Sequence, residues 1–122
     1  MSDKKLTVVL GASPNPERYS YLAVSRLTAK GHPVLAIGNR EALIGATPVT
    51  KEHPVVPDVD TVTLYMNPVL QREYYDYILE LHPRRIIFNP GTENDELATL
   101  ATSKGIEPVE ACTLVLLSTG QY

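Results

Sequence analysis

The sequence has a single cysteine, Cys112, and no surplus of positive charge. One thiol cannot form a disulfide within the chain, and this usage fits a reducing cytoplasm. The 122 residues carry a formal net charge of −3. A surface that binds nucleic acid or an acidic membrane needs clustered lysine and arginine, so the charge balance argues against both partners.

Long apolar runs are also missing. The longest run near the C-terminus, Leu114 to Leu117, is far shorter than the roughly 20 residues that span a bilayer. The opening residues MSDKK lack the apolar core and cleavage site of a signal peptide. We therefore expect a soluble cytoplasmic protein, and the length and globular composition predict one domain over residues 1–122.

No catalytic or metal-binding constellation is visible in the sequence. The histidines each lie beside a proline in a connecting stretch: His32, His53 and His82. They have no partner at metal-ligand or triad spacing, so we expect neither a metal site nor an enzyme. Tyr74 and Tyr77 are interpreted as core residues or as an oligomer interface, which keeps a homodimer open.

The first recognisable unit is a strand, a turn and a helix. Residues 6–10 are a continuous run of apolar and β-branched residues, typical of a parallel strand that is covered on both faces. A turn of small residues, 11–13, follows, and Ser20 is expected to cap the next helix. A helix N-terminus has unpaired amides and a partial positive charge, so this unit suits a phosphate.

Strand-like and helix-like stretches alternate along the rest of the chain. We predict further strands at residues 34–37, 47–49, 59–65, 84–88 and 106–109. One helix is expected to start at Asn67-Pro68 with Leu70 on its apolar face, and another at Thr92 with Asp95 completing a capping box. Residues 112–117 fit a short helix or an extended edge. The alternation predicts a three-layer Rossmann-like, doubly wound α/β domain with a mostly parallel sheet.

In such folds the ligand lies outside the carboxyl ends of the strands, where the strand order reverses. A dinucleotide fingerprint needs three glycines, but the first turn supplies only Gly11, together with Ser13, Ser20 and Arg18. NAD binding also favours an acidic residue after the second strand, where this chain has Asn39-Arg40. A cation at that place suits a phosphorylated ribose, as in NADP or the 3′-phosphate of coenzyme A.

The stretches GASPNPERYSY, KGHPVLAIGNR, VDTVTLYMNP and IIFNPGTENDELATLATSKGI, with the closing Cys112, together resemble the small bacterial CoA-binding-domain proteins. Those proteins are similar to the nucleotide-binding domain of the succinyl-CoA synthetase alpha subunit. The resemblance runs from about Lys5 to Cys112 and implies coenzyme A or an acyl-CoA as ligand. It implies that the phosphates are held by Gly11, Ala12, Ser13, Arg18 and Ser20. It implies that Gly38, Asn39 and Arg40 lie beside the adenosine. It also implies that Tyr65, Pro90 and Gly91 lie along the path of the pantetheine arm.

Three functions stay open at this point. The first is a CoA-binding protein without catalytic machinery, and the second is a small NADP-dependent oxidoreductase or redox sensor. The third is an interaction module with a vestigial pocket. Arg40 favours NADP, whereas the missing glycines and the lack of a visible proton donor count against it. On the first interpretation, Gly11→Val is predicted to block the ligand while the fold largely survives.

Overall fold

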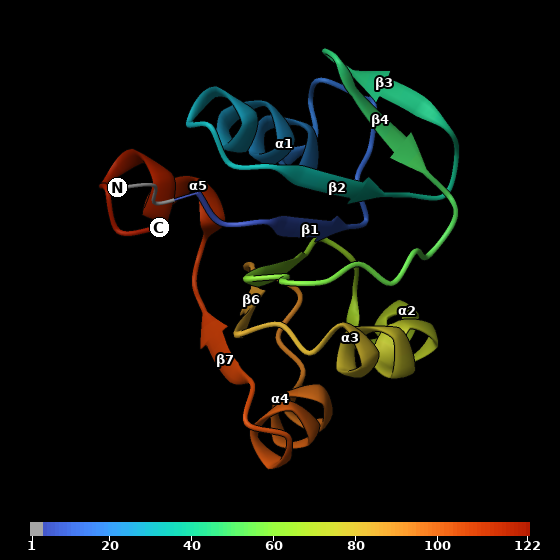
Figure 1. Cartoon of the computed structure of the whole chain (residues 1–122), viewed down its shortest axis with the longest axis vertical. Helices are drawn as coiled ribbons and strands as arrows, with labels where there is room; N and C mark the ends of the chain where they lie inside the picture. The colour runs from blue at the N-terminus through green and yellow to red at the C-terminus, as the bar shows by residue number, and fades with distance from the viewer. Residues whose placement is uncertain (1–3) are drawn as a thin grey trace.

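The computed structural model describes residues 4–122, and its chain winds outward in two directions from a central strand, β1 (Thr7–Leu10). The first half adds three strands on one side: β2 (Val34–Ile37), β3 (Ala42–Ile44) and β4 (Thr47–Thr50). The second half adds three on the other side: β5 (Thr61–Leu64), β6 (Arg85–Phe88) and β7 (Glu107–Glu110). The order is β3-β4-β2-β1-β5-β6-β7 (Figure 1), and among the described strands only β3 and β4 pair antiparallel. The predicted doubly wound sheet is confirmed.

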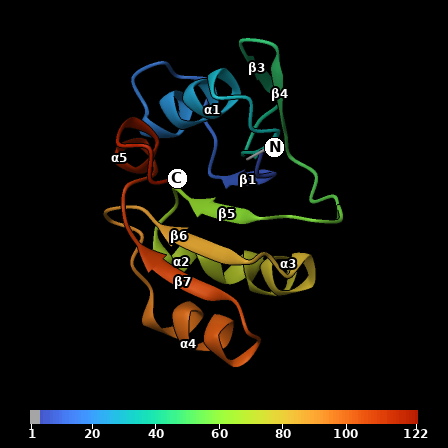
Figure 2. The same cartoon turned by 60° about the vertical axis from the view of Figure 1, so that its left-hand side comes forward.

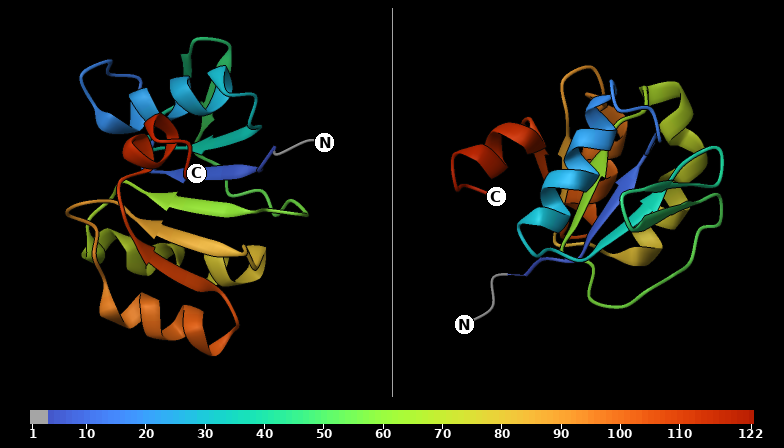
Figure 3. Two further views of the ribbon diagram at one scale, coloured as in Figure 1. Left: turned by 90° about the vertical axis from the view of Figure 1, so that its left-hand side faces the viewer. Right: turned by 90° about the horizontal axis from the view of Figure 1, so that it is seen from above.

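Helices cover both faces of the sheet (Figure 3). On one face α1 (Tyr19–Ala29) packs beside α5 (Thr113–Ser118), so the segment that fitted either a helix or an edge strand is a helix. The opposite face carries α2 (Pro68–Gln71), the 3₁₀ turn η1 (Arg72–Tyr74), α3 (Tyr75–Leu81) and α4 (Asp95–Ser103). Within residues 4–122, none of these helices combines the length and the apolar character needed to cross a bilayer.

Strand β1 has all four residues buried because both of its faces meet helices. Val8 and Leu10 enter the larger core, which the α3 and α4 side chains complete, whereas Val9 enters the core beneath α1. Tyr77 closes the larger core at its rim, and its hydroxyl donates a 2.6 Å hydrogen bond to the Pro54 carbonyl. Burial raises the pKa of Tyr77 to about 12. Tyr77 is therefore a core residue that also fixes the loop before β5.

The start of α1 differs from the expected one. The helix begins at Tyr19 with Arg18 at the N-cap, because the Arg18 amide donates to the Asn15 carbonyl (3.0 Å) and turns the chain early. Ser20 therefore lies inside the first turn and is not the cap. Its Oγ instead accepts a hydrogen bond from the Ser13 amide (3.1 Å), which joins the helix to the loop before it.

Helix α4 also starts later than the capping box predicted. Asn94 is its N-cap, and the Asn94 Oδ1 accepts from the Leu97 amide (3.2 Å). Thr92 is buried, and its hydroxyl donates to the Asn89 carbonyl (2.7 Å). Thr92 therefore closes the turn after β6 and does not begin the helix.

The helix expected from Asn67 onward is divided into α2, η1 and α3. Its start is as predicted, since Asn67 Oδ1 accepts from the Leu70 amide (3.0 Å) and Pro68 is the first helical residue. Gln71 is fully buried and bonded to two neighbouring loops, which fixes the first turn separately from the rest. Leu70 is consequently 48% exposed and is not part of the apolar face.

The edge strand β7 has few groups that another strand could pair with. The Glu107 amide donates to Arg84 and the Ala111 amide to Phe88, so the amides of alternate residues face β6. The backbone groups of Pro108 and Glu110 therefore point away from β6, and proline has no amide hydrogen to donate. Within β7, the outer edge is left with one backbone donor, the Glu110 amide.

Candidate functional site

The loops after β1 and β2 meet at the carboxyl edge of the sheet. The Ile37 carbonyl accepts hydrogen bonds from the amides of both Gly11 and Ala12, each at 2.9 Å. A β carbon on Gly38 would lie 2.2 Å from the Ala12 carbonyl oxygen and 2.9 Å from Val49 Cγ1. These loops can approach so closely only because residue 38 has no side chain.

Gly11 brings the loop after β1 against the loop after β5. Its φ is +90°, and a β carbon there would lie 3.0 Å from the Tyr65 carbonyl carbon. The space beside Gly11 is thus filled by protein backbone. This corrects the expectation that the fold survives Gly11→Val, because the added side chain would collide with Tyr65 and Met66.

The loop between β1 and α1 is held by its own side chains. The Asn15 amide donates to Ser13 Oγ (3.1 Å), and the Glu17 amide donates to Asn15 Oδ1 (3.0 Å). Ser13 and Ser20 both act as hydrogen-bond acceptors here. Ser13 is half-buried and Ser20 is 3% exposed, so the Ser13 hydroxyl is the more accessible to another acceptor such as a phosphate oxygen. Hydrogen bonds within the chain therefore fix the shape of this loop.

Two exposed arginines flank this loop, each next to an exposed glutamate, Glu17 or Glu41. Arg18 is exposed at the N-cap of α1, where the helix dipole also favours an anion. Asn39 and Arg40 are exposed on the adjoining loop after β2. Of the predicted phosphate residues, Gly11 and Ala12 have their amides already paired, so the groups left for an anion belong to Ser13, Arg18 and Ser20.

The predicted pantetheine residues lie on the next loops along the edge. Pro90 and Gly91 are exposed in the turn after β6, where the Gly91 amide donates to Glu93 Oε1 (2.9 Å). Tyr65 directly follows β5, is half-buried and packs in the core beneath α1. The structure thus joins Gly11, Ala12, Gly38 and Tyr65 in one contact zone, and it places Pro90 and Gly91 in a separate turn at the same edge.

A buried polar cluster that sequence reasoning missed supports this edge. Asn89 Nδ2 donates to Thr63 Oγ1 (2.6 Å) and to the Leu64 carbonyl (2.8 Å), and Asn89 Oδ1 accepts from the Thr113 amide (2.8 Å). Asn89 therefore ties the ends of β5 and β6 to the start of α5. The only sequence signal for this cluster was an asparagine directly after an apolar strand. An asparagine in that place is also common in ordinary turns.

The Tyr65 hydroxyl is buried at this cluster. It lies beside the hydroxyls of Thr63 and Thr113 without a well-formed hydrogen bond to either. Burial raises the pKa of Tyr65 above its usual value, so the hydroxyl stays neutral. Cys112 precedes this cluster as the half-buried N-cap of α5.

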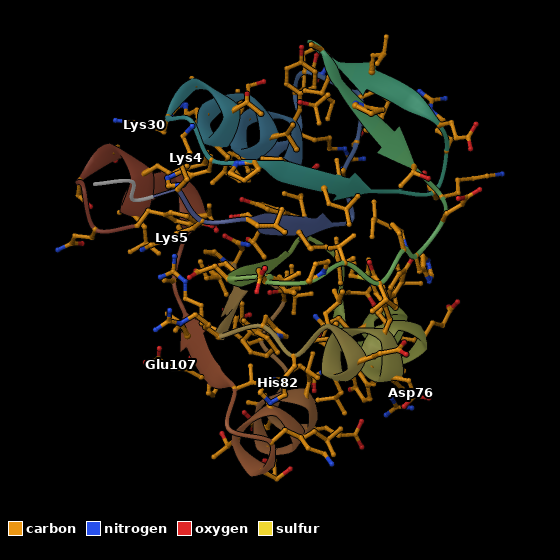
Figure 4. All side chains as sticks on the ribbon, viewed as in Figure 1. Lys4, Lys5, Lys30, Asp76, His82 and Glu107 are labelled. Atoms are coloured by element: carbon orange, nitrogen blue, oxygen red, sulfur yellow. The ribbon has the colours of Figure 1, made fainter. Side chains whose placement is uncertain are left out.

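A surface hollow lies at the opposite edge of the sheet. It has a volume of about 290 Å³ and includes Lys5, Lys30 and His32, which precede β1 and β2. Figure 4 shows Lys5 and Lys30 on the same side of the molecule, near α5. The Lys5 ammonium donates to the Tyr122 carbonyl oxygen, so this hollow belongs to the packing of the last residues. It is remote from the loops at the carboxyl edge.

Comparisons with known proteins agree with this geometry. A family model described as "CoA binding domain" matches residues 5–118. A crystal structure of an uncharacterized protein is 48% identical, with a TM-score of 0.95 over 99% of this chain and 100% of that chain. A hypothetical protein from Pyrococcus horikoshii OT3 is 24% identical, with a TM-score of 0.83 over 96% of this chain and 84% of that chain. A protein from Thermus thermophilus is 22% identical, with a TM-score of 0.84 over 98% of this chain and 91% of that chain. The latter two show the fold alone. No curated protein gave a significant match.

Proposed function

Because this chain belongs to the family of CoA binding domains, we propose that it binds coenzyme A or an acyl-CoA at the carboxyl edge of its sheet and holds it without catalysing a reaction. The observation that supports this most is the close packing of the loops after β1, β2 and β5 through Gly11 and Gly38. This packing presents the start of α1 at the point where strand order reverses, which is the ligand position of doubly wound folds.

The phosphates are assigned to the loop between β1 and α1. Ser13 and Ser20 supply hydroxyl hydrogens, and Arg18 supplies a guanidinium that can bind two phosphate oxygens. Arg40 lies on the loop where the adenosine is expected, so it is assigned to the 3′-phosphate of the ribose. The pantetheine arm is assigned to the loops that carry Tyr65, Pro90 and Gly91.

A titration with matched ligands tests this assignment. Isothermal calorimetry should show CoA binding about tenfold more tightly than dephospho-CoA, because a hydrogen bond to a charged group contributes about 1.5–3 kcal/mol. Arg40→Gln should abolish this difference. Arg26→Gln, an exposed arginine in the last turn of α1, is the control and should preserve it.

Four results would count against the proposal. Equal binding of CoA and dephospho-CoA would remove the role of Arg40, and no binding of either would reject the CoA site. Native mass spectrometry that finds co-purified NADP in place of CoA would favour the oxidoreductase. Conversion of a bound acyl-CoA to CoA by the protein alone would contradict a purely binding role.

A further inference from the structure

A smaller hollow lies at the carboxyl edge, outside the loops assigned to the ligand so far. Its volume is about 170 Å³, and it is lined by Pro68, Val69, Arg72, Tyr75, Asn94 and Glu96. These residues come from α2, η1, α3 and the start of α4, which share one face of the sheet (Figure 2). Pro68 follows Tyr65 by three residues, and Asn94 follows Gly91 by three. The hollow therefore lies just beyond both predicted pantetheine loops.

The loops beside the hollow are held together by Gln71, which is fully buried and hydrogen-bonds the lining residue Asn94. Gln71 Nε2 donates to the Met66 carbonyl (2.9 Å) and to the Thr92 carbonyl (2.8 Å), which joins the loop after β5 to the loop after β6. Gln71 Oε1 accepts from Asn94 Nδ2 (2.9 Å). Every polar group of the buried amide is thereby used in holding the two loops at a fixed separation.

The walls of the hollow are mixed in chemistry and balanced in charge. Asn94 Nδ2 donates to the Tyr75 hydroxyl (2.8 Å), and that hydroxyl donates to Glu96 Oε1 (3.0 Å). Arg72 Nε is 3.8 Å from the same Glu96 oxygen, and both side chains are largely exposed. Pro68 and Val69 form an apolar wall, in which Val69 is 73% exposed. The Arg72 and Glu96 charges offset each other, so a carboxylate placed here would lose its hydration and would have to compete with Glu96 for Arg72. The hollow therefore favours an uncharged group.

The volume limits what the hollow can hold. A water molecule occupies about 30 Å³ of the liquid, so about 170 Å³ accommodates a group of about five or six non-hydrogen atoms. Sites for whole drug-sized ligands are larger, roughly 300–1,000 Å³. The hollow therefore fits the end of a ligand whose main part is bound elsewhere.

We propose that this hollow receives the acyl group of an acyl-CoA and selects short, uncharged acyl groups of about two to four carbons. The inference rests on the proposed function, since the pantetheine arm must end between Tyr65 and Gly91 for the acyl group to reach the hollow. Val69 supplies the apolar contact, and the Arg72–Glu96 pair leaves no net positive charge to bind an acyl group that ends in a carboxylate.

Calorimetric titration with CoA and with acetyl-, butyryl-, succinyl- and decanoyl-CoA tests the proposal. In the unaltered protein butyryl-CoA should bind about fivefold more tightly than CoA, which corresponds to about one buried methylene. Succinyl-CoA and decanoyl-CoA should show no such gain. Val69→Trp fills the hollow, so this variant should bind CoA and butyryl-CoA with about the same affinity. Leu43→Trp, an exposed residue on β3, is the control and should retain the fivefold ratio.

The outcomes separate the two proposals. If CoA binds but Val69→Trp keeps the full preference for butyryl-CoA, the acyl site is rejected and the CoA site stands. The acyl site is also rejected if succinyl- or decanoyl-CoA binds as tightly as butyryl-CoA. If CoA does not bind at all, both proposals are rejected. Equal melting temperatures of the two tryptophan variants will show that the comparison is between folded proteins.

Discussion

Replacing Gly38 by alanine is expected to lower the free energy of unfolding by about 3 kcal/mol, at the upper end of the usual cost of overpacking. The new methyl group would lie 2.2 Å from the Ala12 carbonyl oxygen, which is backbone and cannot rotate away. Either β2 or the loop after β1 must shift. Urea unfolding should show a lower midpoint with an unchanged slope, since the surface exposed on unfolding stays the same.

Gly91→Ala is the matched control for this variant. Gly91 has a φ of +93°, but no atom lies within 4 Å of the position that its β carbon would take. In the control, backbone strain alone should lower the free energy of unfolding, by about 1–2 kcal/mol. If Gly38→Ala is no less stable than Gly91→Ala, the close approach of the two loops is not a constraint on the fold. Because the displaced Ala12 belongs to the assigned phosphate loop, Gly38→Ala should also weaken CoA binding in calorimetry.

The second large effect is expected at Asn89. Asn89→Ala should cost about 3 kcal/mol, because it leaves the Thr113 amide and the Leu64 carbonyl buried without the partners that they have now. The same urea titration measures this change. Since Asn89 holds the start of α5, protease cleavage within residues 112–122 should also become faster in the variant.

Asn67→Ala provides the comparison for Asn89→Ala. Asn67 is exposed, and its side chain makes one capping hydrogen bond to the Leu70 amide. The loss of such a cap costs about 1 kcal/mol. Equal losses at the two positions would mean that the buried cluster contributes no more than a surface cap, in contradiction to its assigned role.

The sequence was sufficient to predict the doubly wound sheet because β1 is covered on both faces. A run of apolar and β-branched residues without polar alternation, such as residues 6–10, is typical of a strand in that situation. The short strand β3 was missed, since three residues of a hairpin leave no periodic pattern. The helix starts at Ser20 and Thr92 were wrong for another reason. Both side chains hydrogen-bond to loop backbone, and a tertiary contact of this kind leaves no local signal.

The candidate site was predictable in its position but not in its construction. Parallel strands place their carboxyl ends at one edge, so the loops at Gly11, Gly38 and Pro90 were expected together there. What spacing alone could not reveal is that Gly11 and Gly38 make room for neighbouring backbone. Their direct contact with a phosphate remains a prediction. The burial of the polar residue Gln71 could not be predicted from the sequence either, because it depends on hydrogen bonds to two carbonyls in separate loops.

The outward face of β7 affects how the protein behaves at high concentration. A sheet whose last strand offers a full row of donors can recruit strands from other copies and grow into a polymer. Here Pro108 interrupts that row, and Glu107 and Glu110 would repel the same residues of an approaching copy. Growth of the sheet by addition of strands is therefore blocked at β7 by one missing hydrogen and two negative charges.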